Sequence, residues 1–368
     1  MDNASRTGAD PRRLRDVIVD DVKRGGAFRS LRRDVRDIYR FYLTEEERER
    51  LGRMSRLKRF FWIAWWLVRN LLLRLSPNRR LLLVVALVFF ALHPTATWSN
   101  VDLTIDFSPA AFLLVLLVLA LELKDKLLAR DEIEVAREVQ LSLLPKSHPA
   151  IPGWEVWSAT TPANDVGGDL IDYIVGAEGR TGLALGDVAG KGMGAALLCA
   201  KLQATLRALA PQAKDLESLG AGLNGVLERA GLDNRYATLF YLEIAPRDPE
   251  VRYLNAGHNP ALVVKPSGIL PLTASSLPLG MLPGTAYAQG TVAFAAGDAL
   301  VLYSDGITEA TNAAGSEYGL ARLESVVGEG RALSAEALAR TILADVARFL
   351  DGERPHDDQS ILVLRRTG

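Results

Sequence analysis

Aspartates beside glycines recur in the C-terminal part of the sequence, where short apolar runs end. In LGDVAGKGMGAAL, residues 185–197, Asp187 lies among four glycines and precedes Lys191. Similar acidic residues are Asp165, Asp169, Asp305, Asp357 and Asp358. One such aspartate usually completes a turn or caps a helix. A set of them supplies the hard oxygen ligands that Mg²⁺ and Mn²⁺ prefer, and glycine lets the backbone approach an ion closely.

Other catalytic chemistries find little support in the sequence. The four histidines have no metal-ligand spacing, which argues against zinc. Cys199, the single cysteine, lies in an apolar helical pattern, and no serine sits in a nucleophile elbow. The glycines around Lys191 lack the spacer of a P-loop. Carboxylates with metal-activated water remain, since two ions roughly 3.5–4 Å apart can activate a water and hold phosphate oxygens.

The sequence from about residue 151 predicts a layered α+β domain, residues 148–368. Runs such as GLALGDV and ALVLYSDG are typical of short strands that end in turns, and SAEALARTILADVARFL is typical of an amphipathic helix. Two predicted helices follow one another in the middle of the domain. This order favours an α+β sandwich over a doubly wound parallel sheet.

Six segments occur in the order DVGGDLIDY, LGDVAGKGMGAAL, YLNAGHNPALV, LPLGM, LVLYSDGITEATN and DDQSILVL. Together they resemble the SpoIIE-type branch of the metal-dependent protein phosphatases, relatives of protein phosphatase 2C, over about residues 135–364. The resemblance implies a central antiparallel β-sandwich flanked by helical layers. It also implies hydrolysis of phosphoserine or phosphothreonine in a phosphorylated regulatory protein, such as a STAS-type antagonist of an anti-sigma factor.

The resemblance assigns roles to individual residues. Asp187 matches the aspartate that bridges two ions, Mn²⁺ or Mg²⁺, with the Val188 backbone carbonyl beside it. Asp169 matches a residue that holds one ion through water, whereas Asp305 and Asp357 match ligands on the other side. Asp187 and Asp305 are therefore the residues expected to be indispensable for catalysis.

Four further residues are expected near the metals or the substrate. Asp165 either holds its loop or supports an additional ion, and Gly306 allows close approach of the backbone. Asp358 stands where more distant relatives carry asparagine, which places it beside the ligands. The phosphate-gripping arginine of eukaryotic relatives has no clear counterpart. Lys191 is therefore either a phosphate ligand at a helix start or a solvated turn lysine.

The histidine proposed as general acid in eukaryotic relatives also lacks a clear counterpart. His258, in NAGHNP, is expected to fix a turn rather than to transfer protons. Glu309 is expected to brace the loop of Asp305.

The N-terminal part of the chain predicts a membrane anchor. Two apolar stretches, residues 81–98 and 108–123, each reach about 24–27 Å as helices, slightly short of a hydrocarbon core of about 30 Å. A two-span hairpin over residues 81–123 is the expectation, with a buried soluble hairpin as the alternative. Residues 59–80 are expected to form a basic interfacial amphipathic helix, with a third span as the alternative.

Charge predicts how the chain is oriented. Residues 1–80 hold 21 Lys and Arg against 11 Asp and Glu, and the connection between the two apolar stretches is acidic. The positive-inside rule then predicts a multi-pass protein of the cytoplasmic (inner) membrane with its catalytic domain in the cytoplasm. The acidic remainder of the chain argues against nucleic-acid binding.

Two segments complete the predicted organisation. Residues 1–58 form a charged helical N-terminal region without a recognisable function. Residues 124–147 form a helical stalk that either carries a signal or a homodimer contact, or is a passive spacer.

These features together predict a membrane-anchored, metal-dependent protein serine/threonine phosphatase. One alternative is a non-catalytic, membrane-anchored scaffold that binds a phosphoprotein, although such a scaffold should have lost ligand aspartates that are present here. A second alternative is a membrane receptor, for which the short connection between the apolar stretches leaves little room.

Overall fold

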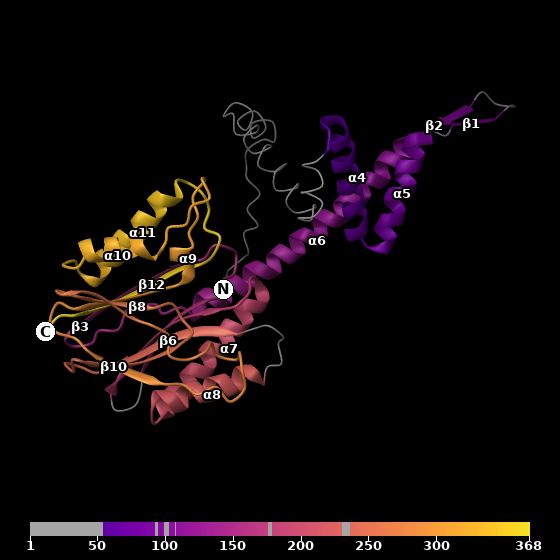
Figure 1. Cartoon of the computed structure of the whole chain (residues 1–368). Helices are drawn as coiled ribbons and strands as arrows, with labels where there is room; N and C mark the ends of the chain where they lie inside the picture. Colours follow the sequence, from indigo (N-terminus) through magenta and orange to yellow (C-terminus); the bar gives the residue numbers. More distant parts are fainter. Residues whose placement is uncertain (1–53, 93–94, 99–102, 107, 176–178, 230–235) are drawn as a thin grey trace, which may run out of the picture. The chain divides into compact units, whose positions relative to one another are not determined.

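The computed structural model describes residues 54–92, 95–98, 103–106, 108–175, 179–229 and 236–368 (Figure 1). Of the predicted N-terminal region, residues 1–58, the first 53 residues lie outside the described part of the chain. The chain divides into two compact units, residues 1–126 and 127–368. Each unit is described by itself, and helix α6 (Ser108–Leu143) runs through the division.

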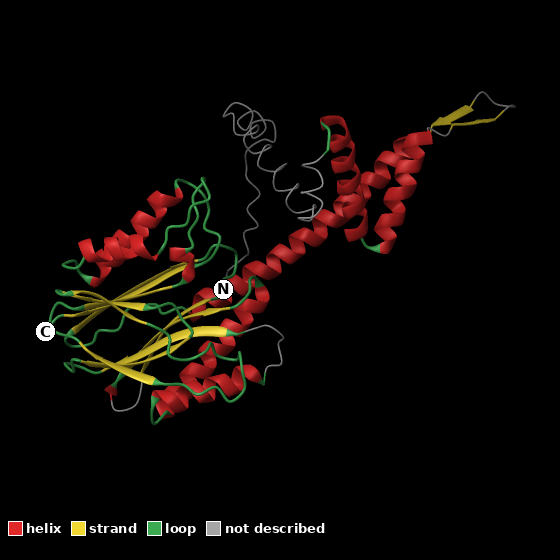
Figure 2. Ribbon diagram, in the orientation of Figure 1, coloured by secondary structure: helices red, strands yellow, loops and turns green. Residues whose placement is uncertain are grey.

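The C-terminal unit contains two five-stranded antiparallel sheets (Figure 2). The first has the order β10-β7-β6-β5-β4 and the second β3-β12-β11-β8-β9. The strands of the first sheet are β4 (Asp169–Val175), β5 (Thr181–Val188), β6 (Ala237–Ile244), β7 (Glu250–Ala256) and β10 (Gln289–Ala293). Those of the second are β3 (Trp154–Thr161), β8 (Ala261–Lys265), β9 (Gly268–Leu272), β11 (Ala299–Tyr303) and β12 (Gln359–Arg366).

Helices cover the outer face of each sheet (Figures 1 and 2). On the first sheet, α7 contacts β4 and β5, and α8 contacts β7; on the second, α11 contacts β3 and β12, and α10 contacts β8 and β9. The helices of this unit, besides the end of α6, are α7 (Met193–Leu209), η2 (Ala210–Gln212), α8 (Leu216–Glu228), α9 (Asp305–Thr308), α10 (Leu320–Glu329) and α11 (Ala335–Leu350). The predicted antiparallel sandwich with helical layers is confirmed.

The apolar sequence of β11 shows why the sandwich forms. All five residues of this strand are buried. Leu300 and Leu302 point into the core between the sheets, while Val301 and Tyr303 belong to the cluster beneath α10 and α11. A strand covered on both faces needs a continuous apolar run rather than alternation. This buried strand ends at Tyr303, two residues before Asp305, one of the predicted site residues.

The N-terminal unit corrects the prediction of a membrane anchor. It contains α4 (Arg56–Arg74), α5 (Pro77–Leu92), the beginning of α6, and the antiparallel pair β1 (Thr95–Trp98) and β2 (Leu103–Asp106). Within the described part of the chain, every helix falls short of the length or the apolar character that crossing a membrane requires. The predicted two-span hairpin and the assignment to the cytoplasmic membrane as a multi-pass protein are wrong.

Each predicted span fails for its own physical reason. The first is interrupted, because α5 ends at Leu92 after 16 residues, about 24 Å, and Thr95–Trp98 form a strand. The second begins a 36-residue helix whose apolar part runs into charged residues. Two of these, Glu122 and Asp125, accept hydrogen bonds from Arg79 at 2.7 and 2.6 Å. Polar pairing thus begins within one turn of the apolar stretch.

Candidate active site

Strand pairing brings the predicted carboxylates to one end of the sandwich. Asp169 begins β4 and is the direct antiparallel partner of Asp187 in β5. Asp305 begins α9, immediately after β11, and Asp357 and Asp358 immediately precede β12, the neighbour of β11. Both sheets therefore contribute carboxylates to this site, at positions far apart in the sequence.

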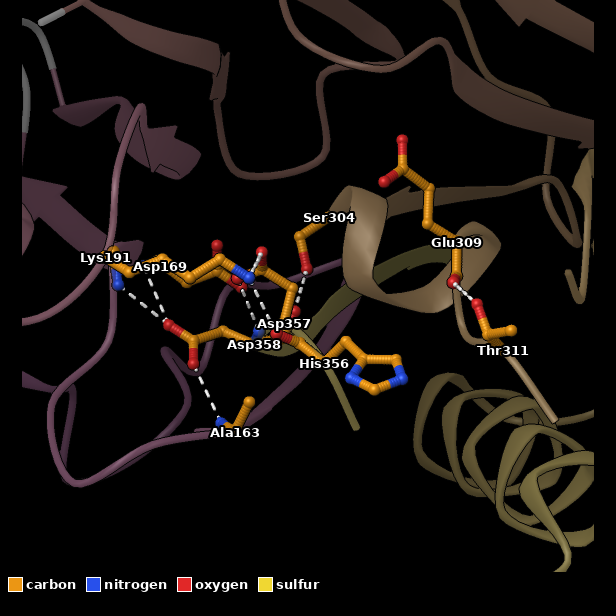
Figure 3. A network of polar contacts seen from close by, with 10 residues as sticks. Ala163, Asp169, Lys191, Ser304, Glu309, Thr311, His356, Asp357 and Asp358 are labelled. Atoms are coloured by element: carbon orange, nitrogen blue, oxygen red, sulfur yellow. Dashed lines mark hydrogen bonds and ion pairs between the residues drawn. The ribbon is translucent and has the colours of Figure 1, made fainter. Parts of the chain in front are cut away.

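Asp358 ties the two sheets together through backbone N–H groups. Its Oδ1 accepts a hydrogen bond from Ala163 N at 2.9 Å, and its Oδ2 accepts one from Gly168 N at 2.8 Å (Figure 3). The Asp358 backbone carbonyl accepts a further bond from Ser304 Oγ at 2.9 Å. The side chain is buried, and both of its oxygens accept hydrogen bonds from backbone N–H groups of the segment between β3 and β4. The role of Asp358 beside the ligands stays a prediction.

Glycines allow these close approaches. A Cβ on Gly167 would lie 2.0 Å from Asp358 Oδ2, and a Cβ on Gly306 would lie 2.1 Å from the Asp358 carbonyl oxygen. A Cβ on Gly168 would stand 3.0 Å from the Val188 carbonyl oxygen and 3.1 Å from Asp187 Oδ1. Glycine at 167 and 306 thus permits the packing around Asp358, and glycine at 168 leaves the Val188 carbonyl oxygen and Asp187 Oδ1 uncovered.

The carboxylates repel one another strongly. Burial, followed by the charges of Asp305 and Asp357, raises the pKa of Asp187 to about 7. Burial and the Asp187 charge raise the pKa of Asp169 well above its ordinary value, and burial and the Asp357 charge raise that of Asp305. Asp169 Oδ2 is also buried without a hydrogen-bond partner among the described residues. A bound cation would offset this repulsion, as protonation of the carboxylates also does.

Lys191 contacts one of the predicted ligands, Asp357. Its Nζ lies 2.8 Å from Asp357 Oδ2 and donates a hydrogen bond to the His356 carbonyl oxygen at 2.8 Å (Figure 3). Lys191 is thus an ion-pair partner of a predicted ligand, rather than the freely solvated turn lysine that was one of its two expected roles.

Asp165 stands apart from the other candidates. Its side chain is 69% exposed and lies 4.0 Å from Arg137 Nη1, a distance at which an exposed ion pair contributes little. In the described part of the chain, no three His, Cys, Asp or Glu side chains converge closely enough to hold a metal ion as they stand. Binding of an ion would therefore require the carboxylates to draw together.

His258 is held neutral in the structure. Burial lowers its pKa to about 4. Its backbone N donates to Asn255 Oδ1 at 2.8 Å, and its Nδ1 lies 2.8 Å from Thr238 Oγ1, which donates to the Asp187 carbonyl oxygen at 3.4 Å. These contacts agree with a turn-fixing role, since a buried neutral imidazole is a poor proton donor.

Glu309 differs from its expected role. Its backbone N donates to the Asp305 carbonyl oxygen at 2.8 Å, so the loop is braced by the main chain. Its exposed carboxylate extends away from the Asp358 network in Figure 3.

Gln140 is a site residue that sequence reasoning missed. From the end of α6, its Nε2 donates to the Gly167 carbonyl oxygen at 2.7 Å, and its Oε1 accepts from Gly167 N at 3.0 Å. The amide thereby pairs with the main chain of the loop that leads into Asp169. Helical patterning marks Gln140 only as a polar position, so nothing in the sequence indicated this contact.

The family model for Stage II sporulation protein E (SpoIIE) matches residues 177–367, which is more than half of the chain. The chain belongs to the SpoIIE family. Among curated relatives, phosphoserine phosphatase RsbU of Bacillus subtilis is 29% identical over 242 residues, covering 64% of this chain and 70% of RsbU. Protein IcfG of Synechocystis sp. is 27% identical over 282 residues, and the match covers 68% of this chain but only 43% of IcfG.

Solved structures show the same fold as this SpoIIE-family chain. The SiaA-PP2C domain of Pseudomonas aeruginosa matches with a TM-score of 0.56 at 18% identity, covering 66% of this chain and 98% of that one. The PP2C phosphatase domain of SpoIIE from Bacillus subtilis, with a fragment of its regulatory domain, matches with a TM-score of 0.51 at 20% identity, covering 60% and 64%. The sandwich is therefore of the PP2C type.

Proposed function

We propose that this chain is a metal-dependent protein serine/threonine phosphatase that hydrolyses phosphoserine or phosphothreonine. The observation that carries the proposal is the placement of Asp169, Asp187 and Asp305 at one end of the sandwich, where burial and the charges of neighbouring aspartates raise all three pKa values. Membership of the SpoIIE family supports the reaction class, because its relatives RsbU and RsbP of Bacillus subtilis are phosphoserine phosphatases by name.

The residues at the site fit a divalent metal by their chemistry. The donors are carboxylate and backbone carbonyl oxygens, which Mg²⁺ and Mn²⁺ prefer. Asp169 Oδ2 has no hydrogen-bond partner among the described residues, and the missing side chain of Gly168 leaves the Val188 carbonyl oxygen and Asp187 Oδ1 uncovered on that side. The Lys191 ammonium beside Asp357 shows that this carboxylate already attracts a cation.

In the proposed site, two ions, Mn²⁺ or Mg²⁺, would be held by five residues. These would be Asp169, Asp187, Asp305, Asp357 and the Val188 backbone carbonyl, the residues that the motif resemblance selects. When bound, such ions supply a water nucleophile at neutral pH and offset charge on phosphoryl oxygens. The chain's own contribution is to hold these oxygens in place through the backbone contacts of Asp358.

The proposed substrate is a phosphorylated regulatory protein of the STAS-type anti-sigma-factor antagonist class. The support is the resemblance of the sequence motifs to the SpoIIE-type branch. An extended protein surface suits the open end of the sandwich, where Lys191 and Asp357 are both about half exposed. Lys191 is the proposed phosphate contact, once it is released from Asp357.

Release of inorganic phosphate tests the proposal. The purified full chain is incubated with a phosphoserine-containing STAS-domain protein, with Mn²⁺, with Mg²⁺, or with a chelator. We expect release with metal and none with chelator, and no release from a phosphotyrosine protein of similar size. Binding of the phosphoprotein without any metal-dependent release would instead favour the phosphoprotein-binding scaffold.

A further inference from the structure

The contacts of Lys191 resemble those of a cation bound to two oxygens. The ammonium lies 2.8 Å from Asp357 Oδ2 and 2.8 Å from the His356 carbonyl oxygen. A carboxylate and a neighbouring backbone carbonyl are also the kind of oxygen pair that a hard divalent ion takes. The lysine thus occupies one side of the proposed metal site.

The turn that carries Lys191 is built to aim it there. Gly190 and Gly192 flank it with φ of 113° and 73°, conformations that disfavour residues with a Cβ. The turn follows β5, so the strand that contains Asp187 also leads to the lysine that contacts Asp357 before β12. The Lys191 charge also works against the rise in the pKa of Asp305.

We propose that Lys191 is an internal counter-cation, which neutralises Asp357 when no metal is bound and competes with a divalent ion for that carboxylate. The inference rests on the proposed function only in taking Asp357 as a metal ligand. Lys191 pairs with Asp357 Oδ2, and Asp357 Oδ1 accepts a hydrogen bond from Asp358 N at 3.0 Å, so an ion that binds Asp357 competes with contacts that engage both oxygens. Lys191 therefore weakens metal binding while it stabilises the metal-free site.

The expected effect is modest. The two side chains are 58% and 44% exposed, and ion pairs with such exposure contribute little. Removing the competitor should therefore tighten metal binding by about two- to fivefold. An effect of this size is resolved by a direct binding titration.

The test is a calorimetric titration of the purified full chain with Mn²⁺ alone, without substrate. Lys191→Gln and Lys191→Met should bind Mn²⁺ about two- to fivefold more tightly than the unsubstituted chain, and Lys191→Arg should bind it with unchanged affinity. Lys265→Gln is the matched control, because Lys265 also contacts one carboxylate and one backbone carbonyl. Its Nζ lies 3.4 Å from Asp298 Oδ2 and 2.8 Å from the Ala293 carbonyl oxygen, and neither residue is a predicted metal ligand. The control should leave the Mn²⁺ affinity unchanged.

The inference is overturned if Lys191→Gln and Lys191→Met both bind Mn²⁺ no more tightly than the unsubstituted chain. It is also overturned if Lys265→Gln tightens Mn²⁺ binding as much as the Lys191 variants do. Absence of any Mn²⁺ binding overturns it together with the proposed metal site. Tightening in the Lys191 variants alone supports it, even if the chain releases no phosphate. In that last case the proposed reaction fails while the counter-cation role stands.

Discussion

At the scale of single residues, the site is a group of carboxylates that the fold holds at an energetic cost. Asp187 is central, because its pKa is raised to about 7 by burial and by the charges of Asp305 and Asp357. In the unfolded chain the same carboxyl has an ordinary pKa of about 3.9. The folded protein without metal therefore loses stability when Asp187 ionises.

The pH dependence of stability follows from this shift. Below about pH 4 the carboxyl is protonated in both states and the folded state suffers no penalty; the penalty grows between about pH 4 and about pH 7, where only the unfolded chain has lost the proton, and is complete above about pH 7. With a chelator present, the unfolding temperature should fall between pH 5 and pH 8, and Asp187→Asn should reduce that fall. Thermal unfolding followed by circular dichroism measures it. A metal-free chain that becomes more stable over this range would contradict the assignment.

Gly167 gives a second prediction at this scale. A methyl group would lie 2.0 Å from Asp358 Oδ2, so Gly167→Ala should displace the loop and cost about 1–3 kcal/mol in the free energy of unfolding. Gly328→Ala is the control, because a Cβ in α10 meets nothing within 4 Å and should stabilise the protein by about 0.5–1 kcal/mol. Denaturant unfolding compares the two. Similar effects of both substitutions would argue against the tight Gly167–Asp358 contact.

At the scale of elements, the end of α6 positions the loop that carries Asp169. The Gln140 amide makes two hydrogen bonds to Gly167, at 2.7 and 3.0 Å. Gln203 and Arg207 of α7 donate to the Leu143 carbonyl oxygen at the same helix end. The helix is therefore fixed both to the loop before β4 and to the helix that follows Lys191.

Removing the Gln140 contact should affect the site more than the fold. Gln140→Ala frees the loop before Asp169, and loss of such a supporting partner typically weakens metal binding by about 10- to 100-fold. Gln212→Ala is the control, because that exposed side chain bonds only to the Ala208 carbonyl oxygen, at 3.2 Å. Mn²⁺ titration distinguishes them, and equal affinities in the two variants would show that Gln140 does not position the site.

The elements also show what the sequence could predict. Strands such as β11 and helices such as α11 were predictable, because local apolar patterning reflects the burial that the sandwich requires. The prediction of membrane spans failed, because the mean hydropathy of residues 81–98 does not indicate where a helix ends. Helix α5 ends at Leu92, just before His93 and Pro94 in the sequence.

At the scale of the whole molecule, the candidate site depends on pairing between distant segments. The motif resemblance selected Asp169, Asp187, Asp305 and Asp357, but no local pattern could place Lys191 on Asp357. The homodimer through the stalk stays a prediction. Leu128, Val135 and other apolar residues of α6 are exposed in their own unit, as such a contact would require.

The central claim is that Asp187 organises a metal site for phosphate-ester hydrolysis. The most direct test is Mn²⁺-dependent phosphate release from a phosphoserine protein by the unsubstituted chain, Asp187→Asn and Asp165→Asn. Asp165 is the matched control, since it is an exposed aspartate of the same loop system. We predict that Asp187→Asn lowers release by more than about 100-fold, whereas Asp165→Asn changes it by less than about tenfold. Equal release by Asp187→Asn and the unsubstituted chain would contradict the account.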